Sequence, residues 1–297
     1  ATEREIEKQE FEKKRLEKVT EKYVFYTNSY YLNLIDPDDK DDPIRKIIIP
    51  SLSELENGGA LDPSNEKKYT KRKGLEHKYG PTALILASRA CGGICRFCFR
   101  KRIFMNNNTE AIPDLDSAVD YIRNNPEINN VLVTGGDPLV FPTSYIDKLL
   151  DDLFSIDHMR FVRIGSKIPV YNPYRILDDQ ELLSVFSRYK GGEKRMYIIT
   201  DINHPKELTP ISKRALRALQ DAGVILSNQT PLLKGINDDP EILSDLMNDL
   251  ASIGIPPYYV FQCRPTVGNA AFSVPIETGY TIFEATKSNT SGLAKRS

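Results

Sequence analysis

The sequence is poor in cysteine, in net charge and in long apolar runs, and each shortage excludes a class of protein. Four cysteines in 297 residues are too few for a disulfide-stapled domain. Forty basic residues offset 41 acidic ones, so no bulk field attracts nucleic acid or an anionic membrane. No apolar run approaches the ~20 residues of a membrane span, and the opening Ala1-Thr-Glu-Arg-Glu5 is not an apolar export signal. We expect a cytoplasmic protein whose partners are small molecules.

Three of the four cysteines lie close together in the sequence. Cys91, Cys95 and Cys98 have the spacing C-x3-C-x2-C. Four-iron clusters are normally held by four thiolates, so a local trio leaves one iron open to an exogenous ligand. A zinc site is the alternative, because Cys263 or a histidine could complete the ligand set, but the second C-x2-C pair usual in zinc ribbons is missing. The spacing favours a 4Fe-4S cluster with one open iron.

From residue 82 onward, short apolar runs alternate with amphipathic stretches. The predicted strands are Thr82 to Ser88, Asn130 to Thr134, Phe161 to Gly165, Met196 to Thr200, Val224 to Asn228 and Tyr258 to Gln262. The predicted helices are Leu115 to Arg123, Ser144 to Leu153, Asp179 to Tyr189, Pro210 to Asp221 and Pro240 to Ile253. This order is typical of parallel βαβ units. It predicts an α/β fold, a partial (β/α)6 TIM-like barrel over residues 81–297.

Residues 1–80 predict an accessory lobe of helical and irregular structure. Charges of both signs at i, i+4 spacing over the first 22 residues indicate a solvated helix. Residues 26–80 contain several breaks, among them Gly58-Gly59 and Asp62-Pro63, and are expected to be irregular.

Polar and glycine residues follow every predicted strand, at the end where barrel folds carry their chemistry. After the second strand, Gly135 and Gly136 allow close backbone approach and Asp137 supplies an acceptor, which together suit an ammonium group. The same residues also form an ordinary turn sequence. His204, before Pro205, is either a site residue or the start of a helix.

With these features together, the chain resembles the lysine 2,3-aminomutase family of radical S-adenosylmethionine (SAM) enzymes. The matching segments include Tyr30 to Pro37, Asp42 to Lys46, His77 to Tyr79, the cysteine loop through Arg102, Thr134 to Pro138, Arg163 to Gly165, Asn203 to Pro205, Ser227 to Thr230, Lys234 to Asp238, Pro257 to Tyr259 and Thr290 to Gly292. The resemblance implies that SAM binds the open iron and yields a 5'-deoxyadenosyl radical, with electrons from a donor such as flavodoxin or ferredoxin. It further implies that pyridoxal phosphate (PLP) holds an amino acid whose amino group moves from C2 to C3, and that the protein is a homo-oligomer.

The resemblance also implies roles for individual residues. Cys91, Cys95 and Cys98 correspond to the cluster ligands, and Arg100 to the arginine that pairs with the substrate carboxylate. The residues that correspond to cofactor contacts are Gly135, Gly136, Asp137 and Gln229, with Lys78 and Tyr79 on the stretch that binds the PLP phosphate. Thr82 replaces an arginine of that stretch, and Asp201 replaces a histidine of the family.

Arg264 is the departure with the largest consequence for the substrate. Lysine-specific members of the family carry at this position an aspartate that grips the substrate ammonium group, whereas a guanidinium would repel lysine and attract a carboxylate. We expect an acidic substrate, with glutamate the nearest analogue. In the alternative, Arg264 pairs with a structural acid.

The family's PLP lysine and zinc-binding cysteines lie beyond the Thr290 to Gly292 segment, and the sequence ends at Ser297. We therefore expect a longer chain. Two other functions remain: a PLP-independent radical SAM enzyme that acts on a peptide or protein, and an inactive scaffold in which the cluster is structural.

Overall fold

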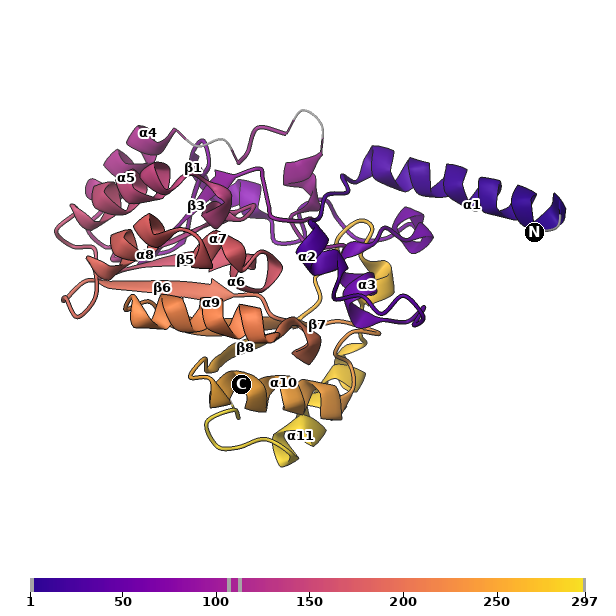
Figure 1. Cartoon of the computed structure of the whole chain (residues 1–297). Coiled ribbons are helices and arrows are strands. Elements are labelled where there is room, and N and C mark those ends of the chain that lie inside the picture. Colours follow the sequence, from indigo (N-terminus) through magenta and orange to yellow (C-terminus); the bar gives the residue numbers. More distant parts are fainter. Residues whose placement is uncertain (1–2, 106–107, 112–113, 296–297) are drawn as a thin grey trace.

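The computed structural model describes residues 3–105, 108–111 and 114–295, with side chains from residue 13 onward. Its centre is one eight-stranded sheet whose strands follow each other in sequence order. They are β1 (Thr70–Arg72), β2 (Leu75–Tyr79), β3 (Thr82–Ser88), β4 (Asn130–Gly135), β5 (Phe161–Ser166), β6 (Arg195–Thr200), β7 (Ile225–Leu232) and β8 (Pro257–Gln262). The first three strands are antiparallel and β3 to β8 are parallel. The sheet curves without closing, which confirms the predicted partial barrel (Figure 1).

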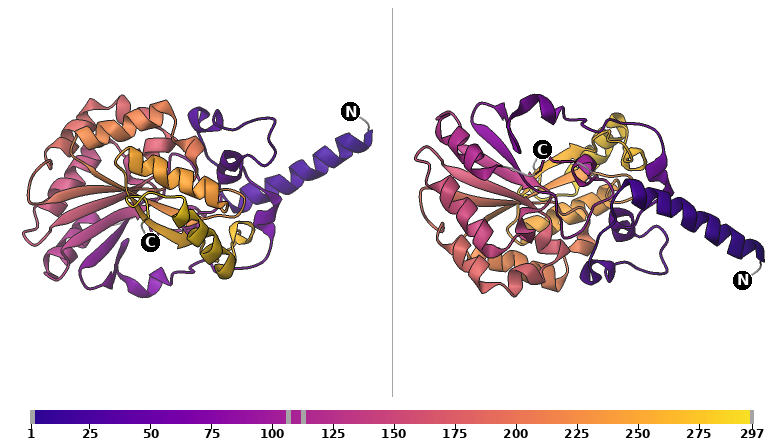
Figure 2. Two further views of the ribbon diagram at one scale, coloured as in Figure 1. Left: turned by 90° about the horizontal axis from the view of Figure 1, so that it is seen from below. Right: turned by 90° about the horizontal axis from the view of Figure 1, so that it is seen from above.

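The helices that connect the parallel strands cover the outer face of the sheet (Figure 2). They are α4 (Leu115–Arg123), α5 (Thr143–Phe154), the short α6 (Ile168–Tyr171) and α7 (Tyr174–Leu177), α8 (Gln180–Ser187), α9 (Pro210–Asp221) and α10 (Pro240–Ser252), followed by α11 (Ile276–Ser288), which packs on α10. Each long connecting helix begins at a side-chain cap or a proline, as its sequence indicates. None of the described helices is long and apolar enough to cross a membrane.

The predicted strands and helices are confirmed, with most bounds within one or two residues, and β7 is the strand that departs most from its predicted bounds. β7 continues to Leu232, past Pro231, although a proline normally ends a central strand. The pairing explains this: β6 is paired with β7 only as far as Asn228, so Pro231 faces β8 alone and no ladder on its other side needs an N–H group.

The two faces of the sheet differ in how well they are covered. Along β5, Val162 and Ile164 are buried against the helices, while Phe161 and Arg163 on the other face are only half-buried. β7 has the same alternation. Parallel strands in α/β proteins are usually buried on both faces and continuously apolar. The inner face of this sheet is instead partly open and polar in the described part of the chain.

The N-terminal segment is more ordered than its sequence predicts. It contains α1 (Glu3–Lys22), α2 (Ser29–Leu32), α3 (Pro43–Ile48), two short 3-10 helices, η1 (Leu52–Leu55) and η2 (Glu66–Tyr69), and then β1 and β2. The two strands were not predicted, because the stretch is short and mostly charged. The solvated helix was predicted correctly: α1 projects away from the barrel, and of its described side chains only Val19 is buried (Figure 1).

Candidate active site at the cysteine loop

The three cysteines lie on the loop between β3 and η3 (Lys101–Phe104), at the carboxyl edge of the sheet. All three are half-buried and free. Burial raises the pKa of each thiol above its usual value. Bare thiolates are therefore disfavoured at these three positions.

Glycines let the cysteine loop pack closely on its neighbours. A Cβ atom on Gly93 would overlap the Tyr171 hydroxyl, and one on Gly92 would lie 2.8 Å from Cδ1 of Ile168. Both neighbours belong to the start and end of α6. Side chains at these two positions would push the loop away from α6, so the two glycines allow the cysteine loop to pack directly against α6.

The Gly135-Gly136-Asp137 turn holds the start of the same loop. The Gly136 and Asp137 amides donate to the carbonyls of Ser88 and Ala90 at 2.6 and 2.8 Å. Gly135 has a φ of +108°, which favours glycine, and a Cβ atom on Gly136 would overlap the Ala90 carbonyl. The turn and the cysteine loop are thus joined backbone to backbone.

The Asp137 carboxylate is already saturated with protein donors. It accepts from the Ser166 hydroxyl at 2.8 Å and from the amides of Leu139, Lys167 and Ile168 at 3.0, 2.7 and 3.1 Å. Burial raises its pKa to about 6 in spite of these bonds. Asp137 joins the ends of β4 and β5, and its predicted contact with SAM stays a prediction.

Two acids of the N-terminal segment neutralise the cations of the cysteine loop. Glu54 accepts from Arg96 Nη2 at 2.7 Å and from Lys101 Nζ at 3.0 Å, and all three side chains are buried. The pairing of Glu54 with these cations was not predicted from the sequence. Its only local signal is the S-x-x-E pattern of the capping box that Ser51 and Glu54 form.

Glu66 does the same for the next pair of cations. It accepts from Arg100 Nη2 at 2.7 Å and from Arg102 Nη2 at 2.6 Å. The Nη1 group of Arg100 reaches Thr134 Oγ1, at the end of β4, at 3.3 Å. The Nε and Nη2 edge of Arg100 is therefore taken by Glu66, which leaves Nη1 as the group available to a ligand.

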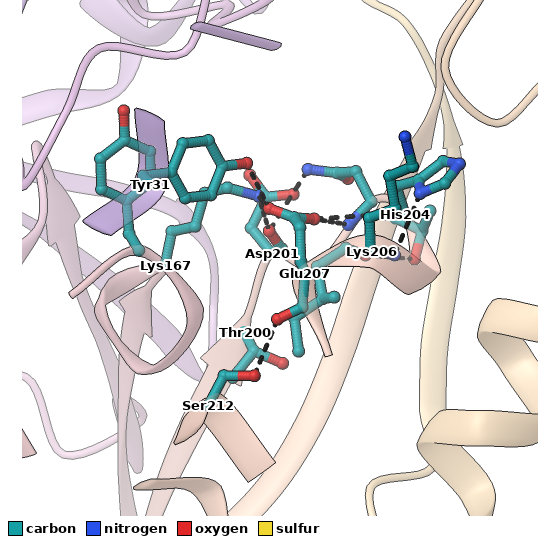
Figure 3. A network of polar contacts seen from close by, with 12 residues as sticks. Tyr31, Lys167, Thr200, Asp201, His204, Lys206, Glu207 and Ser212 are labelled. Carbon is teal, nitrogen blue, oxygen red and sulfur yellow. Dashed lines mark hydrogen bonds and ion pairs between the residues drawn. The ribbon is translucent and has the colours of Figure 1, made fainter. Parts of the chain in front are cut away.

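A buried network of polar contacts lies at the ends of β5 and β6 (Figure 3), and its Lys167 and Asp201 charges act on Cys95. Lys167 Nζ lies 2.5 Å from both the Glu207 carboxylate and the Asp201 carbonyl, and the Tyr31 hydroxyl donates to Glu207 at 2.6 Å. The Lys167 charge lowers the pKa of the Cys95 thiol, against the larger effect of burial. Lys167 was expected only as a polar residue after a strand, and its place beside Cys95 could not be read from the sequence.

His204, in the same region, is a helix-start residue. Its Nδ1 accepts from the Lys206 amide at 3.1 Å, and Glu207 caps back onto the His204 amide, which together form a capping box for η5 (Pro205–Glu207). Burial lowers the pKa of the imidazole.

Arg264 lies in the loop after β8, next to the cysteine loop. Lys101 Nζ donates to the carbonyl of Gly268 in this loop at 2.8 Å, and Asn269 Nδ2 donates to the Phe97 carbonyl at 2.5 Å. The Arg264 side chain is exposed, and no described carboxylate lies within ion-pair distance of it. The alternative in which Arg264 serves a structural acid thus finds no partner in this part of the chain.

The remaining predicted site residues lie farther down the sheet. Gln229 sits in the middle of β7 on the inner face, opposite Tyr259 in the register with β8. Lys78 and Tyr79 end β2, and because β2 runs antiparallel to β3, they lie at the opposite edge of the sheet from the cysteines. The carboxyl edge therefore brings together the cysteine loop, the Gly135 to Asp137 turn, Arg100 and Arg264.

The donor set matches a cluster better than a single zinc ion. Ligands of one zinc ion must lie about 2.3 Å from it, and among the described residues no three His, Cys, Asp or Glu side chains are close enough together to hold a single ion. Cys263, the suggested fourth ligand, is buried in an apolar cluster with Phe97, Tyr171 and Phe272. Three free thiols on one loop fit a four-iron cluster with one open iron.

Comparison with known proteins places this fold and site in a class. The Radical SAM superfamily domain matches residues 85–246, from β3 into α10. The three cysteines are accordingly those of a superfamily that uses a 4Fe-4S cluster and SAM.

Curated relatives narrow the class further. A putative L-lysine 2,3-aminomutase of Aquifex aeolicus is 54% identical over 97% of this chain and 77% of its own length. The L-lysine 2,3-aminomutase of Clostridium subterminale is 39% identical over 89% of this chain, and the glutamate 2,3-aminomutase of Clostridioides difficile is 37% identical over 95%. This chain belongs to the lysine 2,3-aminomutase family of radical SAM enzymes. It spans 62% of the Clostridium subterminale protein and 66% of the Clostridioides difficile protein.

Proposed function

We propose that this chain forms the barrel of an amino acid 2,3-aminomutase whose substrate has an acidic side chain, with glutamate as the first candidate. The observation that carries the proposal is Arg264, an exposed guanidinium with no acid to pair with in the described chain, on the loop after β8 whose residues Gly268 and Asn269 contact the cysteine loop. Relatives of this chain include enzymes named for lysine and one named for glutamate, so family membership alone does not choose between the two.

Two arginines at one edge of the sheet suit a substrate with two carboxylates. Arg100 offers Nη1 to one of them, and its remaining edge is held by Glu66 at 2.7 Å. Arg264 offers an unpaired guanidinium to the other. The free guanidinium of Arg264 can bind a carboxylate in the planar, two-pronged geometry that arginine favours, whereas Arg100 offers the single group Nη1. The ammonium group of a lysine side chain would be repelled at the same place.

The cofactors expected of the family supply the bond chemistry. PLP, when bound, would supply a C=N bond to the migrating amino nitrogen, and the chain's own residues must orient the substrate and exclude water. We place such a cofactor at the partly open inner face of the sheet, which carries Gln229 on β7 and the exposed Tyr259 on β8. A low-potential electron donor such as flavodoxin or ferredoxin and a reducing compartment belong to the proposal.

The substrate test uses the full-length protein, reconstituted anaerobically with iron, sulfide, SAM and PLP. We expect rearrangement of glutamate, with lysine at least about 100-fold poorer in kcat/KM, because a mispaired charge costs about 3 kcal/mol or more. The variant Arg264→Asp should lose glutamate turnover by about the same factor. Arg217→Asp, an exposed arginine of α9 on the outer layer, is the matched control and should be neutral.

The opposite preference would reject the proposal. Efficient rearrangement of lysine by the unchanged protein, or an Arg264→Asp variant with unaltered glutamate kinetics, contradicts the acidic substrate. SAM cleavage without any PLP binding would instead favour a PLP-independent enzyme that acts on a peptide or protein.

A further inference from the structure

Arg163 is a cation without an acid on the inner face of the sheet. Its Nη2 donates to Asn130 Oδ1 at 2.7 Å, while its Nε is buried and has no hydrogen-bond partner. No described carboxylate lies within ion-pair distance of it. The Tyr258 hydroxyl is its other polar neighbour.

This environment is costly for a charge that cannot be removed. Burial lowers the pKa of the Arg163 guanidinium, yet arginine remains protonated at any physiological pH. Arg163 is only half-buried, but its Nε is buried without a partner, and a charged group that loses hydration is normally paired with an acid. The buried cations of the cysteine loop follow that rule, because Arg96, Lys101 and Arg100 each have a glutamate. An unpaired guanidinium on a partly open face therefore points to an anion that is supplied from outside the chain.

The protein prepares the guanidinium for such an anion. Asn130 Oδ1 accepts from both Arg163 and the Thr82 hydroxyl, at 2.7 and 3.1 Å, while its Nδ2 donates to the Pro81 carbonyl at 2.8 Å. The Asn130 amide is thus locked, and it fixes one end of the guanidinium. Preorganised donors of this kind are what anion sites need.

The position of Arg163 along β5 separates its anion from the substrate carboxylates that we assign to Arg100 and Arg264. Arg163 lies three residues before the end of β5, or ~10 Å below the carboxyl edge at about 3.3 Å per residue. Arg100 and Arg264, which we assign to the substrate carboxylates, are at that edge. An anion at Arg163 would lie near Asn130 and Thr82, and Thr82 is paired with the end of β2, which carries Lys78, a second cation.

We propose that Arg163, held by Asn130, binds the phosphate group of PLP. This inference rests on the proposed function, and it names an additional cation for the cofactor in a chain that has Thr82 next to the phosphate stretch. A phosphate monoester and a carboxylate share the chemistry that a guanidinium recognises. The proposal commits to the phosphate.

The test measures binding rather than turnover, on the full-length protein with its cluster reconstituted. The variants are Arg163→Gln and the charge-conserving Arg163→Lys, with Arg217→Gln on the outer layer as the matched control. The ligands are PLP, pyridoxal (which lacks the phosphate), inorganic phosphate and glutamate. Dissociation constants come from calorimetry, and cluster content and the unfolding midpoint report on folding.

We expect Arg163→Gln to weaken PLP binding by about 10- to 100-fold, the usual effect of losing a charged hydrogen bond. Pyridoxal binding should stay unchanged, and the rise in unfolding midpoint caused by inorganic phosphate should disappear. Arg163→Lys should recover part of the PLP affinity, because the charge is kept and the planar geometry is lost. The control should bind all ligands as the unchanged protein does.

Three outcomes would overturn the proposal. Equal weakening of PLP and pyridoxal would make the role of Arg163 structural, and unchanged PLP binding in Arg163→Gln would remove the site. A loss confined to glutamate would assign Arg163 to the substrate. If the unchanged protein binds no PLP but inorganic phosphate still stabilises it through Arg163, the aminomutase proposal fails while the anion site stands.

Discussion

At the cysteine loop the protein supplies its own counter-charges, whereas on the inner face of the sheet it leaves charges open. Glu54 and Glu66 neutralise the buried cations of the loop at 2.6 to 3.0 Å. On the inner face, Arg163 has no acid within ion-pair distance among the described residues, and its Nε has no hydrogen-bond partner. Because its charges are paired within the chain, we interpret the cysteine loop as a fixed scaffold. Because its charges are not paired within the described chain, we interpret the inner face as a surface that binds ligands.

The largest expected effect comes from the cysteines themselves. Replacing Cys91, Cys95 or Cys98 by alanine should abolish SAM cleavage, because a cluster with two protein ligands is not retained. Iron content and release of 5'-deoxyadenosine are the measurements. Cys263→Ala is the control and should keep its iron; a loss of iron as complete as that of the trio variants would make Cys263 a ligand.

Removal of Glu54 tests whether the loop is a fixed scaffold. Glu54→Ala leaves Arg96 and Lys101 buried without a counter-charge, and we expect about 3 to 5 kcal/mol of lost stability. Urea denaturation measures the loss, with the exposed Glu56→Ala as a control expected within about 0.5 kcal/mol. A Glu54→Ala variant as stable as the control would show that the pairing contributes little.

Glu66 connects the cysteine-loop scaffold to the substrate site, because it holds Arg100, the proposed contact of a substrate carboxylate. Glu66→Gln weakens the hold on Arg100, so we expect the KM for the amino acid to rise about 10-fold. Release of 5'-deoxyadenosine without substrate should stay normal, as should the kinetics of the exposed Glu127→Gln control. Should KM remain constant while kcat alone falls, Glu66 would not act through the carboxylate contact.

The smallest expected effect concerns Glu76 and pH. Burial, and next the nearby Glu66 charge, raise the pKa of Glu76 to about 8, well above the usual value for a glutamate. Between about pH 4.5 and 8, the Glu76 carboxyl is therefore protonated in the folded state and ionised in the unfolded state. This contribution to stability is complete below about pH 4.5 and is lost as pH rises through about 8.

Glu76→Gln should remove that dependence. Relative to the unchanged protein, the variant should gain stability as pH rises from 5.5 to 8.5, because it has no carboxyl group at position 76 that must lose a proton. Urea denaturation at both pH values checks this. Parallel stability curves for the two proteins would mean that Glu76 titrates normally.

The sequence predicted the regular part of the fold accurately because that part depends on local pattern. The alternation of apolar runs and amphipathic stretches identified β3 to β8, and the limits of α4 and α9 were predicted to the residue. β1 and β2 were not predicted, because their mostly charged residues show no alternation of apolar and polar side chains. They form a hairpin that pairs with β3, the edge strand of the parallel part of the sheet. The register at β7 beyond Asn228 likewise depends on which neighbour remains to pair.

By itself, the sequence determined the chemistry of the cysteine loop, since the spacing of Cys91, Cys95 and Cys98 is a local property of the chain. It also determined the family and raised Arg264 as the residue that bears on the substrate. Only the tertiary structure decided which charges are paired. Glu54 meets Arg96 and Glu66 meets Arg100 across 42 and 34 residues of chain, and Arg163 meets no acid. Ion pairing depends on separations of a few ångströms in space, and only the folded chain fixes those separations.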